Sequence, residues 1–130
     1  MTYLLDTNVL IALGWETHAH HDRTLKWFQM VESFATCPIT QLGFLRISMA
    51  LPNHSADFAS LRATLDRITK HSAHKFFPCD EDFRVLPQTI RGHQQITDCY
   101  LSELASAHRA KLATLEKVAF AKNVFVIPAI

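Results

Sequence analysis

Three acidic residues stand where a strand-like run of the sequence meets a helix-like one. They are Asp6, Asp98 and Glu116. Because the carboxyl ends of strands in an α/β sheet form a crevice that binds ligands, we expect the three carboxylates to converge there. Oxygen ligands with no His or Cys beside them favour Mg²⁺ or Mn²⁺ over zinc. Such an ion polarises a phosphodiester and generates hydroxide from bound water, so the pattern predicts metal-assisted phosphodiester hydrolysis.

A simpler interpretation of each acid taken alone stays open. An Asp between a strand and a helix is often only an N-cap, which stabilises the helix by about 1 kcal/mol. This applies to Asp6 and to Asp98, which follows the capping residue Thr97. Glu116 before Lys117 is equally ordinary at a helix start. The joint case is stronger than any single one, because all three acids lie at predicted sheet edges.

The elements that must position these acids alternate between strand and helix. Apolar residues at three- and four-residue steps predict a helix over 20–35. We expect Thr40 and Ser55 to cap two further helices. The run 124–127 is apolar throughout, as a strand covered on both faces should be. The remaining predictions are strands at 2–5, 35–39, 75–78 and 112–115, helices at 7–13, 98–109 and 116–121, and a loop with a helical turn over 79–95.

Strands separated by helices imply an α/β fold of three layers, with helices on both faces of a central, mainly parallel sheet of four to five strands. At 130 residues, the chain 1–130 forms a single domain that is long enough to bury a core. The hydrophobic fraction of 48% argues against disorder. The formal net charge of +1 excludes the large basic field that many nucleic-acid-binding proteins carry.

Cysteine content and hydropathy bear on the compartment. Cys37, Cys79 and Cys99 are odd in number and far apart, so they match neither a disulfide framework nor a zinc spacing. We therefore expect reduced, mostly buried thiols in a cytoplasmic protein. The N-terminus lacks the pattern of a signal peptide, and no window of about 18 apolar residues exists, so we expect no membrane association.

Four segments carry the acids and several polar residues in a fixed order. The segments are Leu4–Ile11, Cys37–Arg46, Ile96–Leu101 and Leu112–Lys117. They resemble the four motif blocks of PIN domains, and the most similar kind is the toxin of VapBC toxin–antitoxin pairs. One block alone is a weak signal, whereas four in order with suitable gaps are fairly specific. The resemblance covers essentially the whole chain.

The resemblance implies a PIN-like fold and a metal-dependent endoribonuclease with Mg²⁺ or Mn²⁺ held by acids. Asp6 matches the first acid of the family and Asp98 the third. Glu116 stands where the fourth acid, commonly Asp, is found. These three residues are the predicted metal ligands and catalytic residues. An RNA substrate, a cognate antitoxin protein and a homodimer are likewise implied by the resemblance.

The resemblance also implies a set of supporting residues. Asn8 and Thr114 match polar positions that support the metal or its waters, and Thr7 lies between Asp6 and Asn8. Arg46 matches a frequent arginine, which would orient an acid or meet a phosphate through its bidentate fork. Gln41 completes the set.

Gln41 is the one clear departure from the family pattern, which usually has Glu as the second acid. A glutamine offers a carbonyl oxygen to a cation or a water, but it brings no charge and cannot act as a base. An alternative function is therefore a PIN-fold module that binds RNA or protein with weakened or lost catalysis. A third hypothesis is a phosphatase-like enzyme with Asp6 as nucleophile, but that chemistry usually needs a second Asp where Asn8 stands.

Overall fold

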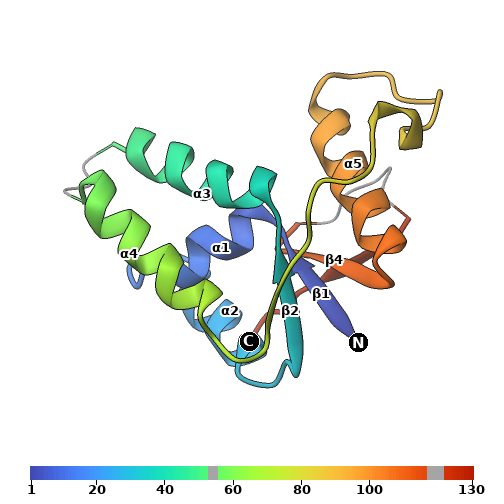
Figure 1. The fold of residues 1–130 in the computed structure, drawn as a ribbon. Helices are drawn as coiled ribbons and strands as arrows, with labels where there is room; N and C mark the ends of the chain where they lie inside the picture. The colour runs from blue at the N-terminus through green and yellow to red at the C-terminus, as the bar shows by residue number, and fades with distance from the viewer. Residues whose placement is uncertain (53–55, 117–121) are drawn as a thin grey trace.

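The computed structural model describes residues 1–52, 56–116 and 122–130. Within these ranges strands and helices alternate along the chain (Figure 1). None of the helices in these ranges is long and apolar enough to cross a membrane. In chain order the elements are β1 (Thr2–Leu5), α1 (Thr7–Gly14), α2 (His21–Phe28), β2 (Ser33–Thr36), α3 (Pro38–Ala50), α4 (Phe58–Thr69), β3 (His74–Phe76), the 3-10 helix η1 (Phe83–Val85), α5 (Gln94–Ala107), β4 (Ala110–Thr114) and β5 (Val124–Val126).

The strands form one parallel sheet in the order β3-β2-β1-β4-β5. In the central strand, Leu4 is paired with Ala35 of β2 on one side and with Leu112 of β4 on the other. Because the strands are parallel, their carboxyl ends meet at one edge of the sheet. The predicted α/β fold with a parallel sheet of four to five strands is confirmed, and the described residues form all five strands.

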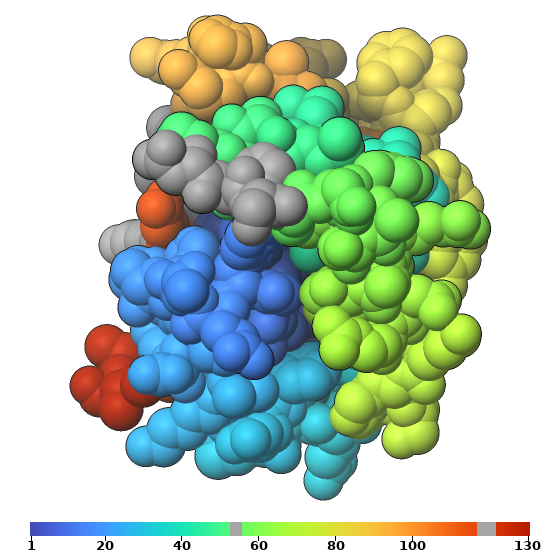
Figure 2. Space-filling view, turned by 90° about the vertical axis from the view of Figure 1, so that its left-hand side faces the viewer, coloured from blue at the N-terminus to red at the C-terminus, as the bar shows by residue number. Residues whose placement is uncertain are grey.

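Helices cover both faces of the sheet (Figure 1). One core lies beneath α1 to α4 and is built around Leu5, Leu10, Phe34 and Phe44. The second core lies beneath α5 and includes Leu4, Ala35, Leu101, Leu104 and Leu112. Alternate residues of β1 therefore serve opposite cores, as the pleat of a strand requires. Figure 2 shows α3 and α4 side by side on the molecular surface, next to α1 and α2.

The predicted helix over 20–35 is too long. Helix α2 ends at Phe28, and residues 33–36 form strand β2. Bonds from the N–H of Met30 and Val31 to carbonyls three residues earlier make a turn between the two elements. The apolar spacing of Phe34 and Ala35 fits a helix, but their side chains alternate into the two cores as strand residues do.

Two predicted helix starts are also misplaced. Helix α5 begins at Gln94, so Asp98 lies in its second turn and does not open it. Helix α3 begins at Pro38, with Cys37 as the N-cap residue. The Thr40 hydroxyl lies inside the first turn, where it accepts the Cys37 N–H at 3.2 Å. A proline at the first helical position suits this start, because its missing N–H would have had no helical partner.

The predictions at the remaining termini have mixed outcomes. Helix α4 is capped by Asp57, whose carboxylate accepts the Ser60 N–H at 2.8 Å. The predicted cap Ser55 and residues 117–121 of the helix predicted over 116–121 lie outside the described residues. The segment 79–95, predicted as a loop with a helical turn, contains the short helix η1, and its last two residues begin α5.

Helix α3 packs closely against the beginning of α1 at Gly43. A Cβ atom on Gly43 would lie 2.7 Å from Oγ1 and 3.0 Å from Cγ2 of Thr7. These separations are shorter than van der Waals contact, so the absence of a side chain at residue 43 allows the approach. Glycine in a helix costs about 0.5 to 1 kcal/mol relative to alanine. The contact brings the first turns of α3 beside the residues that follow β1.

We expect Gly43→Ala to lower the free energy of unfolding by about 1 to 3 kcal/mol, because overpacking outweighs the helix propensity of alanine. Chemical denaturation measures the change. Adding Thr7→Ala removes both clashing atoms and should recover most of the loss. Gly92→Ala is the control, since a Cβ there meets only the flexible Gln94 side chain, at 3.2 Å. A Gly43→Ala protein as stable as the wild type would contradict the packing described here.

Candidate active site

Asp6 lies at the carboxyl end of β1 and caps α1. Its backbone N–H donates to the Ala113 carbonyl at 2.9 Å and extends the pairing of β1 with β4. Its carboxylate accepts the Thr7 N–H at 2.8 Å. The residue is only 8% exposed. Asp6 is therefore an N-cap, as the simpler interpretation holds, but it is also a buried carboxylate at the central sheet edge.

The charges of the three acids affect the pKa values of Asp6 and Asp98. The pKa of Asp6 is raised from 3.8 to about 6, and burial is the largest cause. The charges of Asp98 and Glu116 act in the same direction, whereas the hydrogen bonds from Thr7 and Thr114 oppose the rise. The pKa of Asp98 is also raised, first by burial and then by the charge of Glu116. Electrostatic repulsion thus links the carboxylates that follow β1 and β4 with the one on α5.

Thr114 connects the residues of this site through its hydroxyl. The residue is the last of β4 and is 1% exposed. Its Oγ1 accepts Nδ2–H of Asn8 at 3.2 Å and the Glu116 N–H at 3.4 Å. Its own proton is donated to the Asp6 carboxylate, which lowers the pKa of that group. One hydroxyl therefore fixes the residues after β1 relative to those after β4.

Arg23 of α2 anchors the chain next to Glu116. Its Nη2 donates to the Leu115 carbonyl at 3.3 Å and also to the Ile127 carbonyl, while Nε donates to Ile127 at 3.1 Å. These bonds hold the chain after β4 beside the chain after β5. Glu116 itself is exposed. Its backbone is therefore fixed, whereas its side chain extends toward solvent.

The donor atoms of the site suit a hard divalent cation. Asp6, Asp98, Glu116 and Asn8 offer only oxygen. Oδ1 of Asn8 is buried and has no hydrogen-bond partner among the described residues. A buried acceptor without a partner destabilises the folded protein, so a ligand at this atom would be favourable. Across residues 1–52, 56–116 and 122–130, however, no three His, Cys, Asp or Glu side chains are close enough together to hold a metal ion. The acids repel each other without forming a closed coordination shell.

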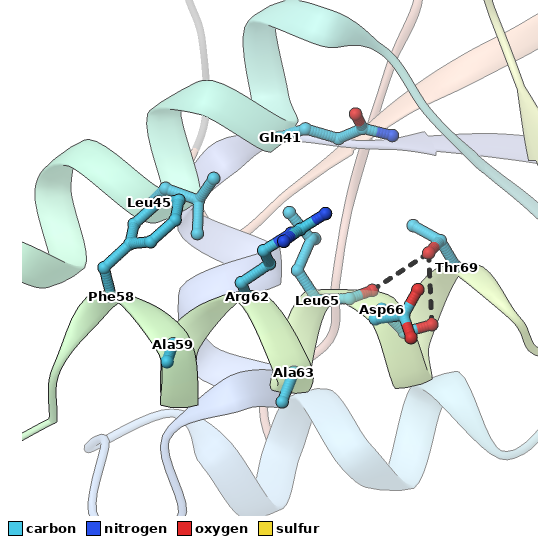
Figure 3. A pocket seen from close by; sticks show the side chains of 9 residues that line it. All are labelled: Gln41, Leu45, Phe58, Ala59, Arg62, Ala63, Leu65, Asp66 and Thr69. Atoms are coloured by element: carbon cyan, nitrogen blue, oxygen red, sulfur yellow. Dashed lines mark hydrogen bonds between the residues drawn. The ribbon is translucent and has the colours of Figure 1, made fainter.

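Gln41 lies at the edge of a different space. Its Nε2 donates to Oγ1 of Thr36 at 2.9 Å. Its side chain lines a pocket of about 520 Å³ between α3 and α4 (Figure 3). No hydrogen bond among the described residues joins Gln41 to the acids. Arg46 is exposed, with no ion pair to any acid in the described part of the chain.

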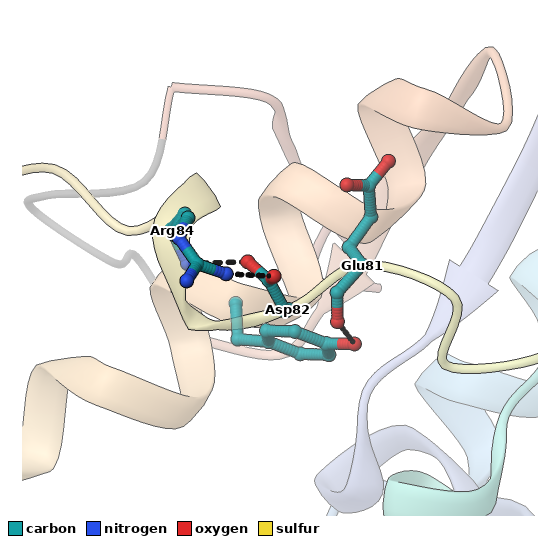
Figure 4. Close-up of polar contacts among 4 residues, drawn as sticks. Glu81, Asp82 and Arg84 are labelled. Carbon is teal, nitrogen blue, oxygen red and sulfur yellow. Dashed lines mark hydrogen bonds and ion pairs between the residues drawn. The ribbon is translucent and has the colours of Figure 1, made fainter.

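The acidic segment after β3 is engaged elsewhere. Asp80 accepts from Nε2 of His108 at 3.0 Å, and Asp82 pairs with Arg84. The Tyr100 hydroxyl donates to the Glu81 carbonyl at 2.6 Å and ties the segment to α5. Figure 4 shows Asp82 turned toward Arg84 and the Glu81 carboxylate apart from that pair. These contacts join the segment to His108, Arg84 and Tyr100 rather than to the three acids.

Sequence reasoning missed three polar residues that the structure makes prominent: Arg23, Thr36 and His74. Arg23 binds carbonyls about a hundred residues away in the chain. Thr36 bonds both Gln41 and His74. No local spacing marks such contacts, because they depend on which strands become neighbours. Thr36 shares one signal with Thr114, a threonine at the carboxyl end of a strand, but the strand predicted over 35–39 does not end at Thr36.

The raised pKa of Asp6 predicts how stability depends on pH. The folded state holds the proton more tightly than the unfolded chain, so the stabilisation by protonation is complete below pH 3.8 and is lost as pH rises through about 6. The shift from 3.8 to about 6 corresponds to about 3 kcal/mol. We therefore expect Asp6→Asn to raise the free energy of unfolding by up to about 3 kcal/mol at pH 8, with the gain fading toward pH 4.

Chemical denaturation at both pH values tests this dependence. Asp66→Asn is a matched control, because Asp66 forms an exposed ion pair with Lys70 on α4 and should change stability by less than about 1 kcal/mol. An Asp6→Asn protein no more stable than the wild type at pH 8 would show that Asp6 is not a strained, desolvated carboxylate.

Comparison with known proteins places this geometry in a family. The PIN domain model matches residues 3–125. Ribonuclease VapC39 of Mycobacterium tuberculosis is 38% identical over 124 residues, covering 89% of each chain. Ribonuclease VapC29 of the same organism is 40% identical over 118 residues, covering 89% of this chain and 86% of the relative.

Solved structures show the same fold. Mycobacterium tuberculosis VapC20, described as a sarcin–ricin loop cleaving toxin, superposes with a TM-score of 0.65 at 11% identity and 92% coverage of both chains. VapBC2 of Rickettsia felis, bound to a DNA fragment from their promoter, gives a TM-score of 0.62 at 19% identity and 97% coverage of both chains. Matched along nearly its whole length by the domain model and by two named ribonucleases, the chain belongs to the PIN-domain family, among the VapC-type ribonuclease toxins.

Proposed function

We propose that this PIN-domain ribonuclease uses Asp6, Asp98 and Glu116 to hold Mg²⁺ or Mn²⁺ and to hydrolyse phosphodiester bonds of single-stranded or looped RNA. The observation that carries the assignment is the nearly buried carboxylate of Asp6 at the carboxyl end of the central strand, and the charges of both other acids add to the rise of its pKa. PIN nucleases are typically metal-dependent. A cation at this place would relieve the repulsion and would give the partnerless Oδ1 of Asn8 a ligand or a metal-bound water to contact.

Each residue of the site has a distinct task in this proposal. When bound, the metal supplies Lewis-acid polarisation of the phosphate and a nucleophilic hydroxide. Asp6, nearly buried, sets the position of the ion relative to the sheet. Asp98, half-buried on α5, and Glu116, exposed after β4, complete the negative site and face the RNA. Thr114 keeps Asp6 ionised by donating to it and orients Asn8 by accepting from it.

Two protein partners belong to the proposal as well. A cognate antitoxin is supported by the likeness of this fold to VapBC2 of Rickettsia felis, which was solved bound to promoter DNA. Leu42 of α3 is 64% exposed and Ile47 is 37% exposed, and such apolar surface suits either an antitoxin or a second copy in a homodimer. All three cysteines are free, which fits the reducing cytoplasm.

The decisive assay measures cleavage of a mixed single-stranded RNA pool with and without Mg²⁺ or Mn²⁺. We expect cleavage to require the metal and to fall by about 100-fold or more in Asp6→Asn and Asp98→Asn, because a lost carboxylate weakens both ion binding and water activation. Glu103→Gln is the matched control on α5. It removes a carboxylate that does not act on Asp6 and should leave the rate within about twofold.

The alternative function is an RNA-binding module without turnover. The observation that favours it is the position of Gln41, whose amide is bonded to Thr36 and not to the acids. Binding of RNA with no cutting at any Mg²⁺ or Mn²⁺ concentration would replace the proposed nuclease by this alternative. Cutting that persists unchanged in Asp6→Asn would instead reject the acidic site.

A further inference from the structure

A chain of hydrogen bonds runs from β3 through the end of β2 to the first turn of α3. Oγ1 of Thr36, at the end of β2, lies 2.7 Å from Nε2 of His74, the first residue of β3. The same oxygen accepts Nε2–H of Gln41 at 2.9 Å. The backbone of Thr69, the last residue of α4, raises the pKa of His74, whereas burial lowers it. Thr36 is fully buried and His74 half-buried.

The direction of each bond in this chain follows from its neighbours. Gln41 donates to Thr36, so the hydroxyl oxygen is the acceptor in that bond and keeps its own proton. Nε2 of His74, 2.7 Å away, is the neighbour that receives this proton. Nε2 is then an acceptor, and a neutral imidazole carries its one proton on Nδ1. With its single proton donated to His74, Thr36 can only accept from residue 41.

We propose that Thr36 and His74 are positioning residues for Gln41. Together they require the side chain at position 41 to donate a hydrogen bond to the Thr36 hydroxyl at the sheet edge. An amide satisfies this requirement with Nε2 and leaves its Oε1 free. An ionised carboxylate has no proton to donate, so glutamate does not fit this arrangement while His74 is neutral. The hydrogen-bond relay of Gln41, Thr36 and His74 thus gives a physical reason, particular to this chain, for glutamine at a position where the family usually has an acid.

His74 is neutral in this arrangement because of its surroundings. Burial lowers its pKa, and no charged side chain contributes to the shift. Its ring packs against Phe34, with centroids 5.3 Å apart. The titratable and charged groups on the packed elements are Arg62, Asp66 and Arg67 of α4, Lys70 at its C-cap, His71 of the following turn, Lys75 of β3 and Glu32 before β2. Asp66 and Lys70 are paired with each other.

A carboxylate at position 41 would reverse the relay. Protonated His74 would donate Nε2–H to Thr36, and the Thr36 hydroxyl would donate to the carboxylate. The added negative charge would then be matched by a positive charge on His74. This consequence for the metal site rests on the proposed function: a fourth acid at position 41 would not add a net charge beside Asp6, Asp98 and Glu116, so Mn²⁺ affinity should change by less than about threefold.

The tautomer of His74 tests the relay in the wild-type protein. Long-range ¹⁵N–¹H NMR correlation spectra distinguish a proton on Nδ1 from one on Nε2. We expect the neutral ring to carry its proton on Nδ1. A neutral ring protonated on Nε2 would overturn the proposal, because Thr36 would then be free to donate to residue 41. This measurement needs neither metal nor RNA, so its outcome is independent of nuclease activity.

The coupling between residues 41 and 74 is tested by NMR titration of His74. We expect Gln41→Glu to raise the titration midpoint of His74 by about one pH unit, as an opposite charge reached through one hydroxyl should. Leu42→Glu is the matched control, because it adds the same charge on the same helix at an exposed position outside the relay. The shift should also shrink when Thr36→Val accompanies Gln41→Glu.

An unchanged His74 midpoint in Gln41→Glu, or an equal shift in Leu42→Glu, would refute the positioning role. Mn²⁺ titration of the same variants separates this result from the proposed function. A wild-type protein that binds no Mn²⁺ would end the proposed metal site but leave the relay intact. A Gln41→Glu variant that binds Mn²⁺ ten times more tightly with His74 unshifted would contradict the relay and retain the metal site.

Discussion

The structure depends on placing a carboxylate at the end of a buried central strand. Leu4 and Leu5 are fully buried on opposite faces, and the next residue, Asp6, must follow them to the sheet edge. Taking this group out of water raises its pKa to about 6. The Thr7 N–H and the Thr114 hydroxyl offset part of that cost. The remaining cost of burying the ionised Asp6 carboxylate is relieved when the group binds a proton or a cation.

The topology of the sheet explains why the buried carboxylate and its polar neighbours lie at this edge. Strand order β3-β2-β1-β4-β5 makes β1 and β4 neighbours although about a hundred residues separate them. Thr114 then joins Asp6, Asn8 and Glu116 through one hydroxyl, and Arg23 secures the carbonyl before Glu116. The other half of the edge is organised differently. There the Thr36 hydroxyl is bonded to both His74 and Gln41, so the ends of β2 and β3 carry neutral hydrogen-bonded groups beside the charged ends of β1 and β4.

Part of this architecture could be predicted from the sequence. The alternation of apolar strands with amphipathic helices gave the parallel sheet, and the motif order indicated the family. Helix limits were less predictable, because Phe34 and Ala35 have a spacing that suits a helix as well as a strand, and only pairing of β2 with β1 decides between them. Asp98 looks like a helix opener beside Thr97, yet α5 begins earlier, at Gln94. The convergence of Asp6, Asp98 and Glu116 as metal ligands remains a prediction, whereas the role of His74 could not be read from the sequence at all.

We expect Asp6 to share a bound cation with Asp98 and Glu116. Carboxyl ¹³C NMR of Asp6, recorded as a function of pH with and without saturating Mg²⁺, measures this sharing at the residue itself. We expect a titration midpoint of about 6 without the ion and a clear fall when Mg²⁺ is added, since a bound cation favours the ionised form. A midpoint that Mg²⁺ leaves unchanged would show that Asp6 does not hold the cation.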